Sequence, residues 1–321
     1  ERGIPLFTSL DTANALANAL TSRYSLGNVE LVDINNMRTK HKKLTFTKMR
    51  GTGNDYLYFD CFDQTVESPE SLAVRLSNRR TGVGSDGIVL IMPSTIADAK
   101  MRMFNADGTE GSVAGNALRC VCKYLYENGH VRKDEMTVET GSGVKTAKLF
   151  IREDQVFSVL VDMGCPAFAP AKIPVKLDGD RVMMRPVFLA GEKREISCVS
   201  MGNPHVVIFV EDVNRIPLEQ VGPQIETDSL FPERVNVSFA QIVDKNDIVM
   251  RVWERGIGET AACGTGACAV AVAAVENGFC TRGADIDVRL PGGTLVVRYQ
   301  EDGKVWLTGD ANTDFTGTIE I

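Results

Sequence analysis

One cysteine of this sequence stands where a thiol could act as an acid or a base. Cys263 lies between small residues (Ala-Ala-Cys-Gly-Thr-Gly over 261–266), directly before an apolar run that predicts a helix over about 265–276. Unpaired N–H groups and the dipole at a helix N-terminus stabilise negative charge, so the pKa of such a thiol can lie below its usual value. The N–H groups of Gly264 and Thr265 could also bind a substrate carboxylate. The alternative is a buried structural cysteine at a helix cap.

The chain contains two copies of one sequence pattern. Landmarks of the first copy recur 149 residues later in the second. The matching pairs are 101–105 with 250–254, Gly53-Asn54 with Gly202-Asn203, Gly115 with Gly264, and 127–129 with 276–278. Because these separated landmarks share one offset, a chance similarity of common residues is a poor explanation. The sequence therefore predicts two homologous halves related by pseudo-symmetry.

The position that corresponds to Cys263 in the first half is occupied by alanine. Ala114 lies 149 residues earlier and is followed by Gly115 and Asn116. Two helix N-termini that meet across a pseudo-two-fold axis suit one small anionic ligand. Thiols at both positions would lie on opposite faces of one carbon atom, which is the geometry for removing a proton from one face and returning a proton to the other. In this chain one of the two thiols is missing.

Each half has the same expected order of elements. A strand (44–47 or 206–210) precedes a second strand that ends at Asn105 or Glu254, and a glycine-rich loop and a helix follow. The helices are expected over about 116–127 and 265–276, with Gly129 and Gly278 as their left-handed stops. A hairpin comes after each helix, over 136–148 and 286–299. Residues 267–275 are all small or apolar, which is typical of a buried helix.

These patterns predict an α+β fold of two pseudo-symmetric domains, with the active site in the cleft between them. Each domain is expected to be a sheet or barrel wrapped around a central helix. We expect the halves to span 44–163 and 164–315, and a terminal strand at 316–321 to return to the first half. Residues 1–43 are interpreted as an N-terminal extension, which is a tag, a targeting remnant or a natural segment.

The composition is that of a globular protein and excludes several functions. Of 321 residues, 44% are hydrophobic and 24% charged, and a net charge of −7 argues against a general nucleic-acid binder. No apolar run approaches the ~18 residues of a membrane-spanning helix. The eight cysteines do not suggest a disulfide scaffold, and the three histidines have no metal-ligand spacing. We therefore expect no metal and no membrane, and a cytoplasmic location, or a plastid one if the extension is a targeting remnant.

Several motifs occur together along residues 44–321. They are 48–55 (Lys-Met-Arg-Gly-Thr-Gly-Asn-Asp), 104–108 (Phe-Asn-Ala-Asp-Gly), 200–205 (Ser-Met-Gly-Asn-Pro-His), 231–236 (Phe-Pro-Glu-Arg-Val-Asn), 254–256 (Glu-Arg-Gly) and 262–266 (Ala-Cys-Gly-Thr-Gly). In this order they resemble the diaminopimelate epimerases, a family of cofactor-independent amino-acid epimerases with two thiols. A single glycine motif would be a weak indication, but the whole set is highly specific.

The resemblance implies a role for each matching residue. Cys263 would be one acid/base thiol, and the other belongs at Ala114, where the family pattern Cys-Gly-Asn reads Ala-Gly-Asn. The residues that would bind the carboxylate at the reacting carbon are Gly115, Asn116, Gly264 and Thr265. Those that would orient its amine are Asn54 and Glu254. Those that would hold the distal amino-acid end are Asn105, Asn203, Asn236 and Arg255.

Structural roles stay open for several of these positions. Asn54 and Asn203 follow glycines and could be simple turn residues. Asp86 is interpreted as a loop anchor. His205 either supports the site or is a packed or capping histidine. The cysteines inside the predicted helices, Cys120, Cys122 and Cys268, are expected in the core.

The resemblance implies an enzyme that interconverts LL- and meso-2,6-diaminopimelate for lysine and peptidoglycan-precursor synthesis. It would use no pyridoxal phosphate or other cofactor and would form a homodimer. The alternatives are a racemase of another amino acid, such as histidine, on the same fold, and a non-catalytic amino-acid binder. A methyl group cannot carry a proton, so we expect the chain as written to be inactive. Ala114 is an engineered change, a natural change, or one for which water or another side chain substitutes.

Overall fold

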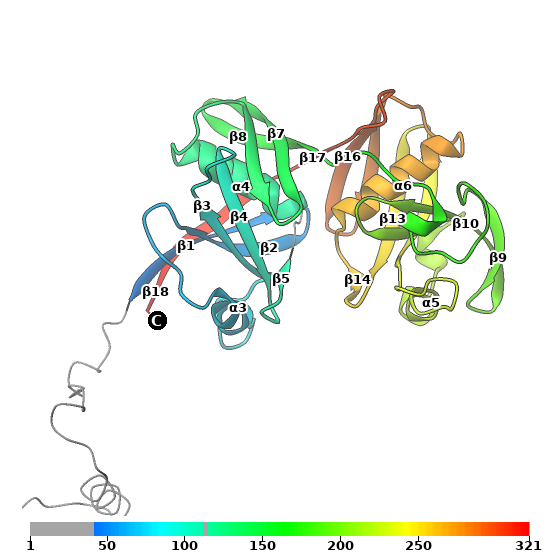
Figure 1. Ribbon diagram of the computed structural model, residues 1–321, viewed down its shortest axis with the longest axis horizontal. Coiled ribbons are helices and arrows are strands. Elements are labelled where there is room, and N and C mark those ends of the chain that lie inside the picture. Colours follow the sequence, from blue (N-terminus) through cyan, green and yellow to red (C-terminus); the bar gives the residue numbers. More distant parts are fainter. Residues whose placement is uncertain (1–41, 112–114, 321) are drawn as a thin grey trace, which may run out of the picture. The chain divides into compact units, whose positions relative to one another are not determined.

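The computed structural model describes residues 42–111 and 115–320 (Figure 1). Most of the expected extension at 1–43, and Ala114, lie outside the described residues. The first half contains β1 (Lys43–Gly51), β2 (Asn54–Asp60), α3 (Pro69–Ser77), β3 (Gly87–Met92), β4 (Ala99–Asn105), β5 (Glu110–Gly111), α4 (Gly115–Glu127), β6 (Glu135–Thr140), β7 (Gly143–Arg152) and β8 (Gln155–Asp162).

The second half repeats this order of strands and helices after one additional strand at its start. It contains β9 (Arg185–Leu189), β10 (Glu192–Ser200), β11 (Pro204–Phe209), α5 (Leu218–Glu226), β12 (Asn236–Asp244), β13 (Asp247–Glu254), β14 (Gly258–Thr260), α6 (Gly264–Glu276), β15 (Asp285–Leu290), β16 (Gly293–Tyr299) and β17 (Val305–Gly309). The last strand is β18 (Asn312–Glu320), and short 3₁₀ turns occur at Pro170–Lys172 and Val213–Arg215.

The repeat predicted from the sequence is confirmed by the bounds and pairings of these elements. Helices α5 and α6, and strand β10, begin and end 149 residues after α3, α4 and β1. In each half the first two strands are antiparallel, the next pairing is parallel, and the same alternation continues to the last hairpin. The chain therefore has an α+β fold with two structural repeats.

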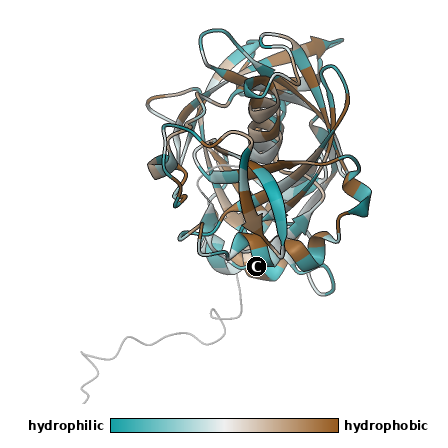
Figure 2. Cartoon of the chain, turned by 90° about the vertical axis from the view of Figure 1, so that its right-hand side faces the viewer, coloured by the Kyte–Doolittle hydropathy of each residue, from teal (hydrophilic) through white to brown (hydrophobic). Residues whose placement is uncertain are grey.

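A helix forms the core of each repeat. Helix α6 is buried along its length and packs against strands β10, β11, β12, β16 and β17. Its small side chains allow the surrounding strands to approach closely. Figure 2 shows a helix enclosed by strands in this way. Helix α4 lies in a separate apolar cluster with Met49, Val89 and Val159, and Cys120 and Cys122 are buried there as expected.

Strands also connect the two halves of the sequence. Strand β17 pairs with β8 of the first half through Leu307 and Val161, and β18 pairs with β1. The turns next to β2 and β16 touch directly, because a Cβ atom on Gly292 would lie 3.0 Å from Cα of Gly53. Backbone from both halves is therefore in contact close to Asn54.

A buried arginine joins α4 to this region. Arg119 is fully buried, and its Nε donates to the carbonyl oxygen of Asp310 at 2.9 Å while Nη2 donates to Oγ1 of Thr52 at 2.8 Å. Thr52 in turn donates its hydroxyl to the Asp310 carboxylate at 2.8 Å. Burial lowers the pKa of Arg119. These hydrogen bonds thus offset the free-energy cost of burying the guanidinium group in the core.

We expect Arg119→Met to lower the free energy of unfolding by about 3 kcal/mol, because it leaves the Asp310 carbonyl without its buried donor and removes the charge near its carboxylate. The matched control is Arg298→Met, since Arg298 and Asp285 form an exposed ion pair on a hairpin. That control should cost less than about 1 kcal/mol. Urea unfolding measures both values, and equal losses would contradict the role assigned to Arg119.

Candidate active site

A cavity of about 980 Å³ is lined by residues of both repeats. It includes most of the residues singled out from the sequence: Asn54, Asn105, Gly115, Asn116, Asn203, Glu254, Cys263, Gly264 and Thr265. Two others, Asn236 and Arg255, are not among its lining residues in the described part of the chain. Within the same ranges no cluster of His, Cys, Asp and Glu side chains could hold a metal ion, and no helix is long and apolar enough to cross a bilayer.

The two central helices begin at the same point of this cavity. A Cβ atom on Gly264 would lie 3.2 Å from Cδ2 of Leu307, and one on Gly115 would lie 3.5 Å from that same atom. Gly115 and Gly264 are the first residues of α4 and α6. Unpaired N–H groups and the positive ends of two helix dipoles therefore converge here. This arrangement favours an anion such as a carboxylate.

Cys263 is the N-cap residue of α6 and is 5% exposed. Its Sγ lies 3.6 Å from Oγ1 of Thr265, and a Cβ atom on Gly266 would be 3.2 Å from it. The expectation of a lowered pKa is wrong for this thiol. Burial and the nearby charge of Glu254 raise the pKa of Cys263, and they outweigh hydrogen bonds from Thr265 and the Gly266 backbone. At neutral pH the thiol therefore holds its proton.

Glu254 ends β13 beside Cys263. Its Oε1 accepts a hydrogen bond from the Thr260 hydroxyl at 2.6 Å. Burial raises the pKa of Glu254, and hydrogen bonds from Thr260 and Cys263 partly oppose that increase. A carboxyl group and a thiol thus share one corner of the cavity. The carboxylate of Glu254 disfavours the thiolate form of Cys263, whereas the neutral thiol donates a hydrogen bond that favours the carboxylate.

Asn203 lines the cavity, and a hydrogen bond with His205 fixes its orientation. Its Nδ2 donates to Oγ1 of Thr265 at 3.2 Å, and its Oδ1 lies 3.0 Å from Nε2 of His205. Burial and the charge of Arg255 lower the pKa of His205 to about 3, so the ring is neutral at pH 7. An amide oxygen only accepts, so Nε2 carries the proton. The hydroxyl proton of Thr265 is then free to point at Cys263.

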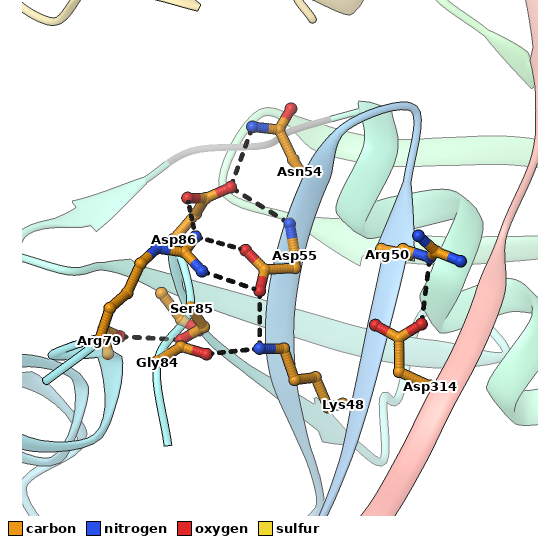
Figure 3. Close-up of polar contacts among 11 residues, drawn as sticks. Lys48, Arg50, Asn54, Asp55, Arg79, Gly84, Ser85, Asp86 and Asp314 are labelled. Carbon is orange, nitrogen blue, oxygen red and sulfur yellow. Dashed lines mark hydrogen bonds and ion pairs between the residues drawn. The ribbon is translucent and has the colours of Figure 1, made fainter. Parts of the chain in front are cut away.

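Asn54 has the corresponding position in the first repeat and is held by Asp86. Its Nδ2 donates to Oδ2 of Asp86 at 3.1 Å, and its Oδ1 accepts from Nδ2 of Asn116 at 2.6 Å. Figure 3 shows Asp86 between Asn54, Asp55 and Arg79. The interpretation of Asp86 as a loop anchor agrees with these contacts.

The comparisons with known proteins agree on one family. The family model for diaminopimelate epimerase matches residues 46–169 and 197–313. The chain belongs to the diaminopimelate epimerase family. It is 48% identical over 279 residues to the diaminopimelate epimerase of Acetivibrio thermocellus, covering 87% of this chain and 99% of the relative. The enzyme of that name from Desulfovibrio desulfuricans is 50% identical over 285 residues, again covering 87% and 99%.

Solved structures extend the likeness to more distant proteins of the same fold. A phenazine biosynthesis protein of the PhzF family from Bacillus anthracis superposes with a TM-score of 0.64 at 19% identity, covering 87% of this chain and 100% of that chain. A hydroxyproline epimerase from Agrobacterium vitis gives a TM-score of 0.57 at 16% identity, with coverage of 89% and 94%. At this level of identity the likeness shows the fold alone.

In this diaminopimelate epimerase family member, Asn236 and Arg255 hold a loop together beside the cavity. Asn236 is 4% exposed; its Nδ2 donates to the carbonyl of Pro204 at 2.8 Å, and its Oδ1 accepts from the backbone N–H of Arg255 at 3.0 Å. The Arg255 guanidinium donates to the carbonyl of Glu233 at 3.0 Å. Asn105 does line the cavity, and its Nδ2 donates to Oγ1 of Thr109 at 2.9 Å.

The cavity also contains residues that the sequence did not indicate. Met163 and Lys145 line it, and Leu307 lies against the first residue of both central helices. Lys145 lies in β7, Met163 directly follows β8 and Leu307 lies in β17, and these segments carry no motif. The only available signal was the repeat itself, which pairs the turn before Lys145 with the turn at Gly292-Gly293.

We expect Glu254→Gln to accelerate alkylation of Cys263 by iodoacetamide at pH 8 by about three- to tenfold. The carboxylate raises the pKa of the thiol, so its removal increases the thiolate fraction at that pH. Peptide mass spectrometry of quenched time points measures the rate at Cys263 alone. The matched control is Glu259→Gln, because Glu259 pairs with Arg251. An unchanged or slower rate in Glu254→Gln would contradict this account.

Proposed function

We propose that this protein has the active site of an epimerase for LL- and meso-2,6-diaminopimelate. The reaction of such an enzyme is proton transfer at the α carbon without a cofactor. The observation that carries the proposal is the cavity in which the N-termini of α4 and α6 converge beside Cys263. Relatives named diaminopimelate epimerase match the chain over nearly their whole length, which supports the same substrate.

The cavity offers complementary groups to an amino acid. The unpaired N–H groups at Gly115, Asn116, Gly264 and Thr265 would bind the carboxylate at the reacting carbon. Glu254 and Asn54 would orient its amine. Asn105 and Asn203 would contact the distal end, while Asn236 and Arg255 support that end through the loop they hold together. The helix ends would also stabilise the negative charge that develops when the α proton leaves.

Inversion requires a proton donor on one face of the carbon and a base on the other. Cys263 holds its proton at neutral pH and is the donor in one direction of the reaction, and in the reverse direction the two positions exchange the roles of donor and base. The base belongs at position 114, where this chain has alanine. We therefore propose that the chain as written binds diaminopimelate but does not invert it. The same alanine also supports the second candidate, a non-catalytic amino-acid binder.

We expect the chain as written to invert neither stereoisomer at a measurable rate in deuterated water, because a positioned acid or base contributes about 100- to 10,000-fold. We expect the small thiolate fraction of Cys263 to exchange the α proton of one stereoisomer slowly with retention, because the same thiol removes and returns the proton on one face. Ala114→Cys should restore inversion of both. Proton NMR of LL- and meso-diaminopimelate, incubated with each protein, measures exchange and inversion separately.

The control is Ala114→Ser, which adds a hydroxyl of similar size but much weaker acidity and should stay inactive. Inversion by the chain as written at a rate comparable to Ala114→Cys would contradict the two-thiol mechanism. Binding of diaminopimelate without turnover by Ala114→Cys would favour the non-catalytic binder.

A further inference from the structure

One buried amide oxygen in the cavity wall has no hydrogen-bond partner among residues 42–111 and 115–320. Asn116 lies in the first turn of α4 and is 5% exposed, and its Oδ1 accepts no hydrogen bond from the described residues. A Cβ atom on Gly264 would lie 3.9 Å from this oxygen, so it lies close to the start of α6. An unpaired buried acceptor is costly, and a ligand that donates to it would recover that cost.

The direction of this amide is set by its neighbours. Asn116 Nδ2 donates to Oδ1 of Asn54 at 2.6 Å, and Asn54 Nδ2 donates to Oδ2 of Asp86 at 3.1 Å. A carboxylate accepts hydrogen bonds only, so Asn54 must direct its nitrogen at Asp86 and its oxygen at Asn116. Asn116 then uses an N–H group toward Asn54 and leaves its oxygen for the cavity.

Asp86 itself is fixed from several sides (Figure 3). Its Oδ2 also accepts from the backbone N–H of Asp55 at 3.1 Å, and its Oδ1 accepts from Nη2 of Arg79 at 2.9 Å. Its backbone N–H donates to the Asp55 carbonyl at 2.8 Å, and its carbonyl accepts from Ala106 at 3.0 Å. The carboxylate therefore cannot turn away from Asn54 without breaking its hydrogen bonds with the Asp55 backbone and with Arg79.

Arg79 and Lys48 connect Asp86 to a wider ion-pair network. Arg79 also pairs with Asp55 at 2.6 Å, and Lys48 pairs with Asp55 at 2.8 Å while donating to the Gly84 carbonyl at 2.7 Å. Burial would raise the pKa of Asp55, but hydrogen bonds from Arg79 and Lys48 hold it below its usual value. The network thus keeps the loop that carries Asp86 next to Asn54.

The corresponding asparagine of the second repeat has its amide oriented the other way, so the repeated fold alone does not set the orientation of Asn54. Asn203 corresponds to Asn54, yet its oxygen accepts from His205 and its nitrogen donates to Thr265. The amide of Asn203 is therefore oriented opposite to that of Asn54, because its partner His205 donates a hydrogen bond whereas Asp86 accepts one. The acceptor Asp86 is what distinguishes the first repeat.

We propose that Asp86 is a positioning residue that acts through Asn54 and Asn116 to present a hydrogen-bond acceptor to the ammonium group of an amino-acid ligand. This inference rests on the proposed function, because it takes the ligand to be an amino acid. A carboxylate cannot pair with the Asn116 oxygen, whereas an ammonium group donates to it. The carboxylate of the ligand is left to the backbone N–H groups of the two helix ends.

The first test is Asp86→Asn, with meso-diaminopimelate as the probe in titration calorimetry at pH 7.5. The new amide has one oxygen, which accepts from Arg79, so its N–H₂ group faces Asn54. Asn54 then turns its oxygen toward residue 86 and its nitrogen toward Asn116, and Asn116 turns its oxygen toward Asn54 and away from the ligand. We expect affinity to fall about tenfold or more, since a hydrogen bond to a charged group is lost. The matched control is Asp314→Asn, whose ion pair with Arg50 in Figure 3 does not touch the cavity. It should change affinity by less than about twofold.

The decisive test is a rescue that moves the carboxylate. Adding Asn54→Asp to Asp86→Asn leaves the net charge unchanged and again places an acceptor-only group beside Nδ2 of Asn116. We expect the double variant to bind about fivefold or more tightly than Asp86→Asn. Adding Asn116→Ala to the double variant should remove this gain, because the gain depends on the Asn116 amide and not on direct attraction of the ammonium by the carboxylate that Asn54→Asp introduces. A purely structural role of Asp86 in its pair with Arg79 would not be restored by this exchange.

The outcomes separate this inference from the proposed function. Unaltered affinity in Asp86→Asn, or a double variant that binds no better than Asp86→Asn, would overturn the role of Asp86. Absence of binding by the unchanged chain would overturn the proposed function and this inference with it. If thermal unfolding shows that Asp86→Asn is not folded, Asn116→Ala removes the acceptor directly, and undiminished affinity in that variant would overturn the inference.

Discussion

The structure depends on two buried helices that begin at one point. A helix N-terminus leaves backbone N–H groups without partners, and burying them without a partner is unfavourable. Here both sets open into one cavity, and Leu307 lies next to the first residue of each helix. The strands around α4 and α6 hold this convergence in place. The site is therefore a property of the two repeats together, and neither repeat contains it alone.

The surroundings of the convergence decide how each side chain behaves there. Cys263 has the helix end that would favour a thiolate, but burial and Glu254 outweigh it. Asn54 and Asn203 occupy corresponding positions and have opposite directions because Asp86 accepts and His205 donates. The repeat thus supplies symmetric positions, and single neighbouring residues make their chemistry unequal. This chemical difference between the two repeats suits a reaction that needs a proton donor on one face of a carbon atom and a base on the other.

Much of the fold could be predicted because the signals are local and repeated. Left-handed glycines at Gly129 and Gly278 mark the helix ends, and both helices begin one residue before the expected start. The hairpins expected over 136–148 and 286–299 form as β6 with β7 and β15 with β16. The pKa of Cys263 could not be predicted, because it depends on burial and on a carboxylate nine positions away in the sequence. The positions of Asn236 and Arg255 outside the cavity could not be predicted either, because they depend on hydrogen bonds between residues that are far apart in the sequence.

The pairing of β18 with β1 also bears on how the chain is completed during synthesis. Domains usually fold in the order in which they are synthesised. Here one edge of the first repeat stays unpaired until residues 312–320 have been made, and β8 stays without its partner β17 until residues 305–309 have been made. An open strand edge is a site for unwanted pairing with other chains. The repeat that is translated first is thus completed only after most of the second repeat has been made, so a nascent chain that ends before residue 305 has both edges uncovered.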